Sequence, residues 1–142
     1  MEKTKEKIQN MKNEKQTLVL LAEEDSHLAD IYTKFLKKEG IKVVVERNGE
    51  MVAEVTKKRK PDLVILEAIL PNIDGFSVLE KLKTNKSTKS IPVILFTSVG
   101  QKEDVERALD LGAEEYLLKA HTKPVDLVRK IKNIKNILKN KL

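Results

Sequence analysis

The chain has 142 residues, of which 40% are hydrophobic and 35% are charged, and its formal net charge is +6. We expect a single domain from this length, not a multidomain enzyme, and a chain that folds around a core, not one that is disordered throughout. The absence of cysteine excludes disulfides, thiolate metal sites and thiol catalysis.

The positive charge is concentrated at the two ends of the chain. Residues 1–17 hold five lysines and three glutamates, and residues 123–142 hold seven basic residues and one acid, Asp126. By subtraction, residues 18–122 hold 16 basic and 18 acidic residues, a net charge of −2. Because a DNA-reading domain is usually basic throughout, nucleic-acid binding through the basic termini is only a weaker alternative.

No segment predicts contact with a membrane. The longest apolar runs, such as Leu18 to Ala22, fall far short of the roughly 18 residues that span a bilayer. Residues 1–16 are rich in lysine and glutamate and lack the apolar core of a secretory signal, so we expect a cytoplasmic location. We divide the chain into this charged N-terminal extension, a frayed helix or a disordered segment, and a domain over residues 17–142.

Short apolar segments alternate with segments of helical period from Thr17 onward, which predicts α/β architecture with a parallel sheet. The predicted strands are Leu18 to Ala22, Ile41 to Glu46, Asp62 to Leu66, Ile91 to Phe96 and Glu115 to Leu118. The predicted helices are Ser26 to Glu39, Gly49 to Lys58, Gly75 to Lys83, Lys102 to Leu111 and Pro124 to Asn140. Most strands are continuously apolar, which indicates helices on both faces of the sheet. The second and fifth are more polar and suit edge positions.

The last predicted helix carries an apolar stripe of Leu127, Ile131, Ile134 and Leu138, at spacings of four, three and four. Packing of this stripe on the sheet is the simplest interpretation. An apolar stripe of this width could also serve a dimer partner. The basic residues on the other sides of the helix are typical of a solvated face.

Polar side chains follow four of the predicted strands. Glu23, Glu24 and Asp25 follow the first strand, Glu67 ends the third, Thr97 and Ser98 follow the fourth, and Lys119 follows the fifth. In a doubly wound sheet such groups converge beyond the carboxyl ends of the strands. Several carboxylates, a hydroxyl and a lysine around one crevice are the groups of a divalent-cation and phosphoryl site.

Taken together, these segments resemble the receiver domain of bacterial two-component response regulators, over residues 17–142. The resemblance is carried by Glu23-Glu24-Asp25, by residues 61–67 (PDLVILE), by residues 70–75 (LPNIDG), by Phe96-Thr97-Ser98, and by Gly112-Ala113 leading into Tyr116 to Lys119. It implies a flavodoxin-like, doubly wound, five-stranded parallel sheet of order 2-1-3-4-5 with five helices. It also implies a signalling module and not an enzyme. Such receivers accept a phosphoryl group from a histidine kinase on an aspartate at the end of the third strand, with Mg²⁺ held by neighbouring acids.

Glu67 stands where this resemblance places the phosphoacceptor aspartate. The extra methylene displaces the carboxylate from in-line geometry, so we expect phosphoryl transfer to be severely impaired. We therefore predict a stand-alone, atypical receiver that acts in phosphorelay signalling as a phosphorylation-independent interaction module. The Glu67 carboxylate could partly imitate phosphoaspartate beside Lys119 and Thr97, or it could leave the domain inert. A competent phosphoacceptor with Mg²⁺-dependent transfer is the alternative.

The resemblance implies that Glu23, Glu24, Glu67 and the backbone carbonyl of Ile69 are the Mg²⁺ ligands. Glutamate replaces the more usual aspartate at Glu24 as well as at Glu67, and two lengthened ligands crowd a small ion that requires octahedral geometry. We therefore expect a weak or empty Mg²⁺ site. Carboxylates without a metal repel one another, so we also expect stability to depend on Mg²⁺ and pH.

The resemblance also assigns a switch. Thr97 and Tyr116 resemble the hydroxyl and the aromatic residue of the switch pair, and Lys119 completes the phosphoryl pocket. The family usually has proline after Lys119, whereas this chain has Ala120, so we expect a trans peptide and a different path into the last helix. The implied partners are a histidine kinase or a downstream signalling protein, with a possible homodimer through the last two helices and the last strand.

Other chemistries find no support in the sequence. His27 and His121 are the only histidines and lack the spacing of zinc ligands. The glycines form neither a GxGxxG nor a Walker pattern, which removes nucleotide binding as a supported hypothesis.

Overall fold

The computed structural model describes residue 4 and residues 16–141, with side chains described as far as residue 136. The prediction of a frayed or disordered extension over residues 1–16 concerns residues that, apart from 4 and 16, lie outside this range. The strands are β1 (Leu18–Ala22), β2 (Lys42–Glu46), β3 (Leu63–Leu66), β4 (Val93–Thr97) and β5 (Glu115–Leu118). The α-helices are α2 (Ser26–Lys38), α3 (Gly49–Arg59), α4 (Gly75–Thr84), α5 (Lys102–Asp110) and α6 (Pro124–Lys141), with a 3₁₀ turn η1 (Lys119–His121) before α6.

The five strands form one parallel sheet of order β2-β1-β3-β4-β5, which confirms the predicted doubly wound topology. The register pairs Ala22 with Leu66 and Leu66 with Leu95, so the central strands end at the same level. The more polar strands β2 and β5 lie at the two edges, as predicted. Side chains of the three inner strands are buried almost throughout, because helices cover both faces.

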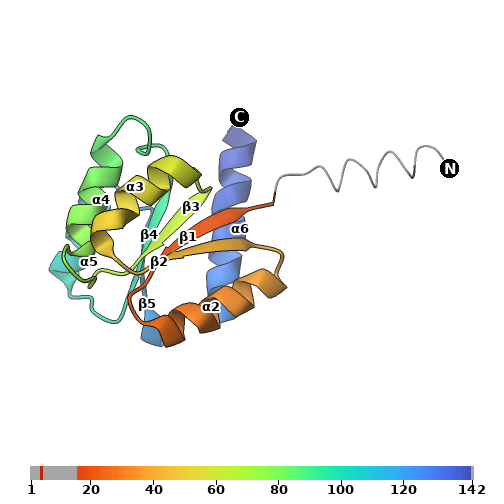
Figure 1. Cartoon of the computed structure of the whole chain (residues 1–142), viewed down its shortest axis with the longest axis horizontal. Helices are drawn as coiled ribbons and strands as arrows, with labels where there is room; N and C mark the ends of the chain where they lie inside the picture. Colours follow the sequence, from red (N-terminus) through yellow and green to blue (C-terminus); the bar gives the residue numbers. More distant parts are fainter. Residues whose placement is uncertain (1–3, 5–15, 142) are drawn as a thin grey trace.

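Two helical layers enclose the sheet (Figure 1). On one face, α3, α4 and α5 pack through Val52, Leu79 and Ala108 on alternate residues of the strands. On the other face, α2 and α6 pack through Leu36 and Leu127. Because strand side chains alternate in direction, the neighbours Leu20 and Leu21 enter different cores.

Strand and helix boundaries follow local chemistry. The fourth strand begins at Val93, two residues later than predicted, because Pro92 has no N–H to donate to the ladder. Before β3, the Asp62 carboxylate accepts a hydrogen bond from Leu18 N at 2.8 Å, which ties the starts of β3 and β1 together. At the opposite edge, Asp25, Asn48 and Asp74 cap the N-termini of α2, α3 and α4.

The apolar stripe of α6 packs on the sheet. Leu127, Val128 and Ile131 are buried, and Ile134 lies partly buried against the same core. The side chain of Leu138 lies outside the described residues. Use of this helix in a dimer stays a prediction. None of the helices in the described part of the chain is long and apolar enough to cross a bilayer.

Candidate functional site

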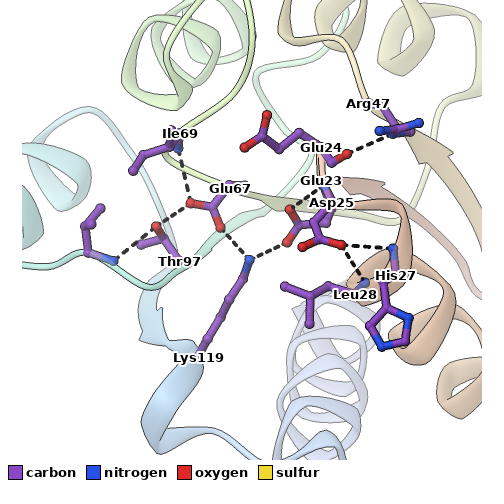
Figure 2. Close-up of polar contacts among 11 residues, drawn as sticks. Glu23, Glu24, Asp25, His27, Leu28, Arg47, Glu67, Ile69, Thr97 and Lys119 are labelled. Carbon is purple, nitrogen blue, oxygen red and sulfur yellow. Dashed lines mark hydrogen bonds and ion pairs between the residues drawn. The ribbon is translucent and has the colours of Figure 1, made fainter.

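Four of the predicted site residues meet at the carboxyl edge of the sheet. Glu23 and Glu67 directly follow β1 and β3, Thr97 ends β4, and Lys119 directly follows β5. Figure 2 shows the Lys119 ammonium between the Glu23 and Glu67 carboxylates, with Thr97 on the far side of Glu67. Glu23, Glu67 and Thr97 are only 3%, 6% and 0% exposed, so the charges in this cluster lie largely out of water.

Lys119 forms ion pairs with both buried carboxylates. Its Nζ donates a hydrogen bond to Glu23 Oε1 and lies 2.7 Å from Glu67 Oε2. The contact with Glu67 is short enough for an ion pair, but its angles depart from those of a hydrogen bond. Burial alone would lower the pKa of Lys119, but the two carboxylates outweigh burial and raise this pKa. The ammonium is therefore held in its charged form.

The second oxygen of Glu67 is bound from the other side. Glu67 Oε1 accepts hydrogen bonds from Thr97 Oγ1 at 2.5 Å and from the backbone N–H of Ile69 at 3.2 Å. Thr97 Oγ1 in turn accepts a hydrogen bond from Val99 N at 3.4 Å. The carboxylate is thus fixed between a hydroxyl, an amide and an ammonium, which are the groups that would bind the oxygens of an anion.

The two other acids that follow β1, Glu24 and Asp25, make contacts outside the Glu67 cluster. The Glu24 side chain is exposed, and its backbone carbonyl accepts a hydrogen bond from Arg47 Nε at 2.8 Å. Asp25 Oδ1 accepts from the N–H groups of His27 and Leu28, as the N-cap of α2. Glu24 and Arg47 line a shallow hollow of about 330 Å³ beside the cluster.

The predicted Mg²⁺ ligands do not form a preformed metal site. Both oxygens of Glu23 are engaged, one with Lys119 and the other with Asp25 N at 3.2 Å, and both oxygens of Glu67 have partners. Ile69 contributes an amide to Glu67. Among the described residues, no group of three or more histidine or acidic side chains is arranged to hold a metal. The weak or empty Mg²⁺ site over Glu23, Glu24, Glu67 and Ile69 stays a prediction.

Tyr116 is connected to the cluster through the chain after β4. Its hydroxyl donates a hydrogen bond to the carbonyl oxygen of Val99, the residue whose N–H binds Thr97. Burial, with smaller contributions from Asp104 and Glu67, raises the pKa of Tyr116. A Cβ at Gly100 would lie 2.7 Å from Leu118 Cδ2 and 3.0 Å from Tyr116 Cε1, so glycine leaves the space that the tyrosine ring occupies.

Tyr32 and Phe96 are site residues that sequence analysis missed. Their rings meet edge to face at 5.1 Å, and Lys119 Nζ lies 5.8 Å from the centroid of Phe96. Burial raises the pKa of Tyr32, and the charges of Lys119, Glu23 and Glu67 act on it. Tyr32 belongs to the apolar stripe of its helix and Phe96 to an apolar strand, so nothing in their spacing distinguished them from other core residues.

Backbone features shape the loops around the cluster. A Cβ at Gly75 would clash with the carbonyl oxygen of Glu67 and lie 2.7 Å from Ala68 Cα, so only glycine lets α4 begin this close to the end of β3. The peptide before Ala120 is trans, as predicted, since no cis peptide occurs in the described part of the chain. The chain instead turns through η1 before it enters α6.

Comparison with solved structures agrees with this geometry. The BeF3-activated N-terminal receiver domain of Klebsiella pneumoniae RstA is 30% identical, with a TM-score of 0.75 over 82% of this chain and 96% of that one. The receiver domain of the sensor histidine kinase PA1611 from Pseudomonas aeruginosa, which holds a magnesium ion in its active-site cleft, is 22% identical. Its TM-score is 0.76 over 84% of this chain and 97% of that one, and at this identity it shows only the fold.

Sequence relatives and a family model complete the comparison. The DNA-binding dual master transcriptional regulator RpaA of Synechocystis is 30% identical over 121 residues, 85% of this chain and 48% of that protein. The chain spans about half the length of the curated relatives it matches. The model of the response regulator receiver domain matches residues 19–132. Receiver domains act in two-component signalling and interact with histidine kinases, and this chain belongs to the response regulator receiver domain family.

Proposed function

We propose that this receiver domain works in two-component signalling as a phosphorylation-independent interaction module, with Glu67 in place of the phosphoacceptor aspartate. Glu67 directly follows β3, the position that phosphoacceptor aspartates occupy in receivers, and its carboxylate lies beside Thr97 and Lys119. The observation that carries the proposal is that one carboxylate already binds the hydroxyl at 2.5 Å and the ammonium at 2.7 Å. No phosphoryl group is needed to bring these three groups together.

The Glu67 carboxylate imitates a phosphoryl group only in part. It supplies one negative charge and two oxygens, whereas a phosphoryl group adds a charge of about −1.5 to −2 and three acceptor oxygens. Both oxygens of Glu67 are engaged, one by Thr97 and Ile69 and the other by Lys119. The direction of Thr97 toward Glu67 supports constitutive imitation of the phosphorylated state over an inert arrangement.

A competent phosphoacceptor is the second candidate function. It would need a Glu67 oxygen to be free for in-line attack on a phosphodonor. In the structure Oε1 is hydrogen-bonded to Thr97 and Ile69 while Oε2 faces Lys119, so attack requires one of these contacts to open first. The short Thr97 contact therefore favours the first proposal.

We further propose that the partner is a histidine kinase or a downstream signalling protein, and that the domain works in the cytoplasm beside it. A homodimer through α5, β5 and α6 is part of this proposal. Tyr116 on β5 connects that surface to the cluster through Val99 and Thr97. Val99 and Leu109 are large apolar residues that are 41% and 49% exposed near it, and they suit a protein contact.

The test is the intact mass of the protein after incubation with MgCl₂ and acetyl phosphate. Wild type and Glu67→Asp are compared under the same conditions, since Glu67→Asp restores the carboxylate length of the usual acceptor. We expect Glu67→Asp to gain the mass of one phosphoryl group and wild type to gain none. A Glu67→Asp, Thr97→Val double variant serves as a matched control that keeps the aspartate and removes the hydroxyl contact.

Each other outcome has a definite meaning. Labelling of wild type would overturn phosphorylation independence and establish the competent receiver. If neither protein is labelled, features of the cluster other than Glu67 also prevent phosphorylation. The domain would then act only by binding a partner, and an aspartate at position 67 would not restore phosphotransfer. Glu67→Gln then separates imitation from inertness, because loss of the charge changes partner affinity only if the carboxylate holds the active arrangement.

A further inference from the structure

A basic surface lies at the edge of the sheet opposite the Glu67 cluster. The C-terminal ends of α3 and α4 and the loop over residues 85–92 meet there, on the same side of the molecule in Figure 1. Residues 57–60 and 81–92 contain no acidic side chain. The exposed cations of this surface are Lys57, Lys58, Arg59, Lys60, Lys81, Lys86 and Lys89. The net charge of −2 over residues 18–122 does not reveal that these cations are grouped on one surface.

Within the part of the chain that the structure describes, these seven cations form no ion pairs. None of them has an acidic partner within salt-bridge distance among the described residues, whereas Lys119, Lys130 and Lys132 on other surfaces do. Basic residues in the last turn of a helix stabilise its dipole, which accounts for part of the set on α3. It does not account for Lys86 and Lys89, which lie in the loop beyond α4.

Lys83 shows what a structural lysine in this region looks like. It is partly buried and donates hydrogen bonds to the carbonyl oxygens of Lys89 at 3.2 Å and Ile91 at 2.8 Å. Burial lowers its pKa, and Glu114 only partly opposes this. Lys83 holds the loop after α4 in place, whereas the seven exposed cations donate no such hydrogen bond within residues 16–136.

A hollow of about 290 Å³ lies within the basic surface, between α3 and the end of α4. It is lined by Ala53, Lys81, Thr84, Asn85 and Thr88. Asn85 Oδ1 accepts hydrogen bonds from the backbone amide and the hydroxyl of Ser87. Lys57 lies one turn beyond Ala53 on the same helix face. Ammonium and amide donors around a hollow suit phosphate oxygens.

We propose that this basic surface binds the phosphodiester backbone of a nucleic acid without reading its sequence. Most protein contacts to nucleic-acid phosphates come from lysine, arginine, and serine, threonine or asparagine side chains, which are the residues found here. No aromatic side chain belongs to residues 57–60 or 81–92, so no base stacking is available. The acidic carboxyl edge, with Glu24 and Glu46 beside the Glu67 cluster, would repel the same polyanion.

An anionic membrane is a poorer match for this surface. Membrane-bound surfaces combine cations with apolar side chains that enter the lipid. Among the residues whose side chains are described, the large apolar side chains that are exposed lie elsewhere: Ile31, Val45, Met51, Ile69, Val99, Leu109 and Val125. The basic surface therefore exposes polar side chains. Such a surface suits contacts with a phosphate backbone and lacks the apolar side chains that insertion into lipid needs.

The test measures fluorescence anisotropy of a labelled 20-base-pair DNA duplex of arbitrary sequence, with the full chain, between 50 and 200 mM NaCl. The variant is Lys57→Gln, Lys81→Gln, Lys86→Gln. Two controls remove the same charge elsewhere: Lys34→Gln, Lys37→Gln, Lys38→Gln on α2, and Lys3→Gln, Lys5→Gln, Lys7→Gln in the N-terminal extension. Thermal melting confirms that each variant folds.

We expect wild type to bind with a Kd of about 10⁻⁴ to 10⁻⁶ M near physiological salt. The variant should lose at least about tenfold in affinity at 50 mM NaCl, and its slope of log K against log salt should become shallower by about 2 to 3, whereas each control should lose less than about threefold. Three outcomes would overturn the proposal. They are equal losses in all three variants, the largest loss in the extension variant, and binding to phosphatidylglycerol vesicles without binding to the duplex.

Discussion

In the Glu67 cluster at the carboxyl edge of the sheet the charged groups are buried and paired, whereas in the basic surface at the amino edge they are exposed and, among the described residues, make no ion pair. Lys119 lies between Glu23 and Glu67 with its side chain only 12% exposed. Lys57 and Lys86 extend into solvent at the other edge. The two edges therefore use similar residue types for different purposes.

The difference determines which charges stabilise the fold. A buried carboxylate that loses its counter-ion keeps the cost of desolvation and loses the compensating attraction. An exposed lysine that is removed loses only a screened interaction with distant charges. Charges of the Glu67 cluster should thus be sensitive to substitution in a stability measurement, and charges of the basic surface should be sensitive only in a binding measurement.

Lys119→Met gives the largest expected effect. It keeps the unbranched shape of the side chain, one atom shorter, and leaves Glu23 and Glu67 buried without a cation, so the free energy of unfolding at pH 7 should fall by about 3–5 kcal/mol. Urea denaturation followed by circular dichroism measures this change. Lys130→Met is the matched control, because its ion pair with Glu115 at 2.8 Å is about 40% exposed and should contribute about 1 kcal/mol or less. Similar losses in both variants would remove the contrast between buried and exposed pairs.

The same ion pairs predict a loss of stability in alkaline solution. The carboxylates raise the pKa of Lys119 above 10.5 against the effect of burial, so its contribution is complete below pH 10.5 and is lost as the pH rises through the higher folded-state value. The raised pKa values of Tyr32 and Tyr116 act in the same direction above pH 10.0, and the lowered pKa of Lys83 acts in the opposite one.

The free energy of unfolding of wild type and Lys119→Met, measured between pH 9 and 11.5, isolates the part due to Lys119. We expect the difference between the two proteins to shrink as the pH rises. A constant difference over this range would mean that the ammonium does not stabilise the cluster through its charge.

Thr97→Val tests the hydroxyl side of the cluster. Valine keeps the shape of the fully buried Thr97 and removes the donor to Glu67 Oε1, which leaves an anionic oxygen with only the weaker Ile69 contact. We expect the free energy of unfolding to fall by about 1.5–3 kcal/mol. Thr88→Val is the matched control, since Thr88 is equally buried but donates to a neutral carbonyl, that of Leu82. A larger loss at Thr88 would contradict a charge-assisted bond at Thr97.

The amino edge should tolerate the loss of its charges. In Lys57→Gln, Lys81→Gln, Lys86→Gln the free energy of unfolding should change by no more than about 0.5 kcal/mol, because these side chains are exposed and make no ion pair among the described residues. Denaturation of this variant in parallel with Lys119→Met measures the contrast directly. Destabilisation by several kcal/mol would show that the basic surface is part of the folding energetics.

Magnesium should have the smallest effect. The Lys119 ammonium already occupies one oxygen of each buried carboxylate, so 10 mM MgCl₂ should stabilise wild type by less than about 0.4 kcal/mol relative to EDTA, as expected for a Kd above about 10 mM. In Lys119→Met the two carboxylates have lost their ammonium partner, so Mg²⁺ should bind them and raise the melting temperature. A clear Mg²⁺ dependence in wild type would restore the predicted metal site.

The sequence predicted the topology well because hydrophobic runs and helical periods are local signals. It predicted the first and fifth strands with their observed bounds, and it failed by two residues at Val93, where a proline alters the ladder. It also brought Glu67, Thr97 and Lys119 to one edge, since the ends of parallel strands coincide.

What escaped prediction was the direction of side chains and the partition of charge in space. Glu23 extends the hydrogen-bond ladder of the sheet, because its N–H donates to the carbonyl oxygen of Glu46, and its side chain is buried. The side chain of the next residue, Glu24, is exposed. One residue decides between burial and exposure here. The basic surface escaped because a net charge is a sum, and its members become neighbours only when α3 and α4 are packed side by side.

Gly75 determines the backbone geometry of the site, whereas Glu67 supplies its functional group. A side chain at this position would collide with the backbone of Glu67 and Ala68, so any substitution there shifts a helix. A substitution at Glu67 changes one functional group and leaves that backbone approach untouched. A receiver can therefore exchange its reactive group in a single mutational step and keep the same frame, so that loss or recovery of phosphotransfer does not require the fold to be rebuilt.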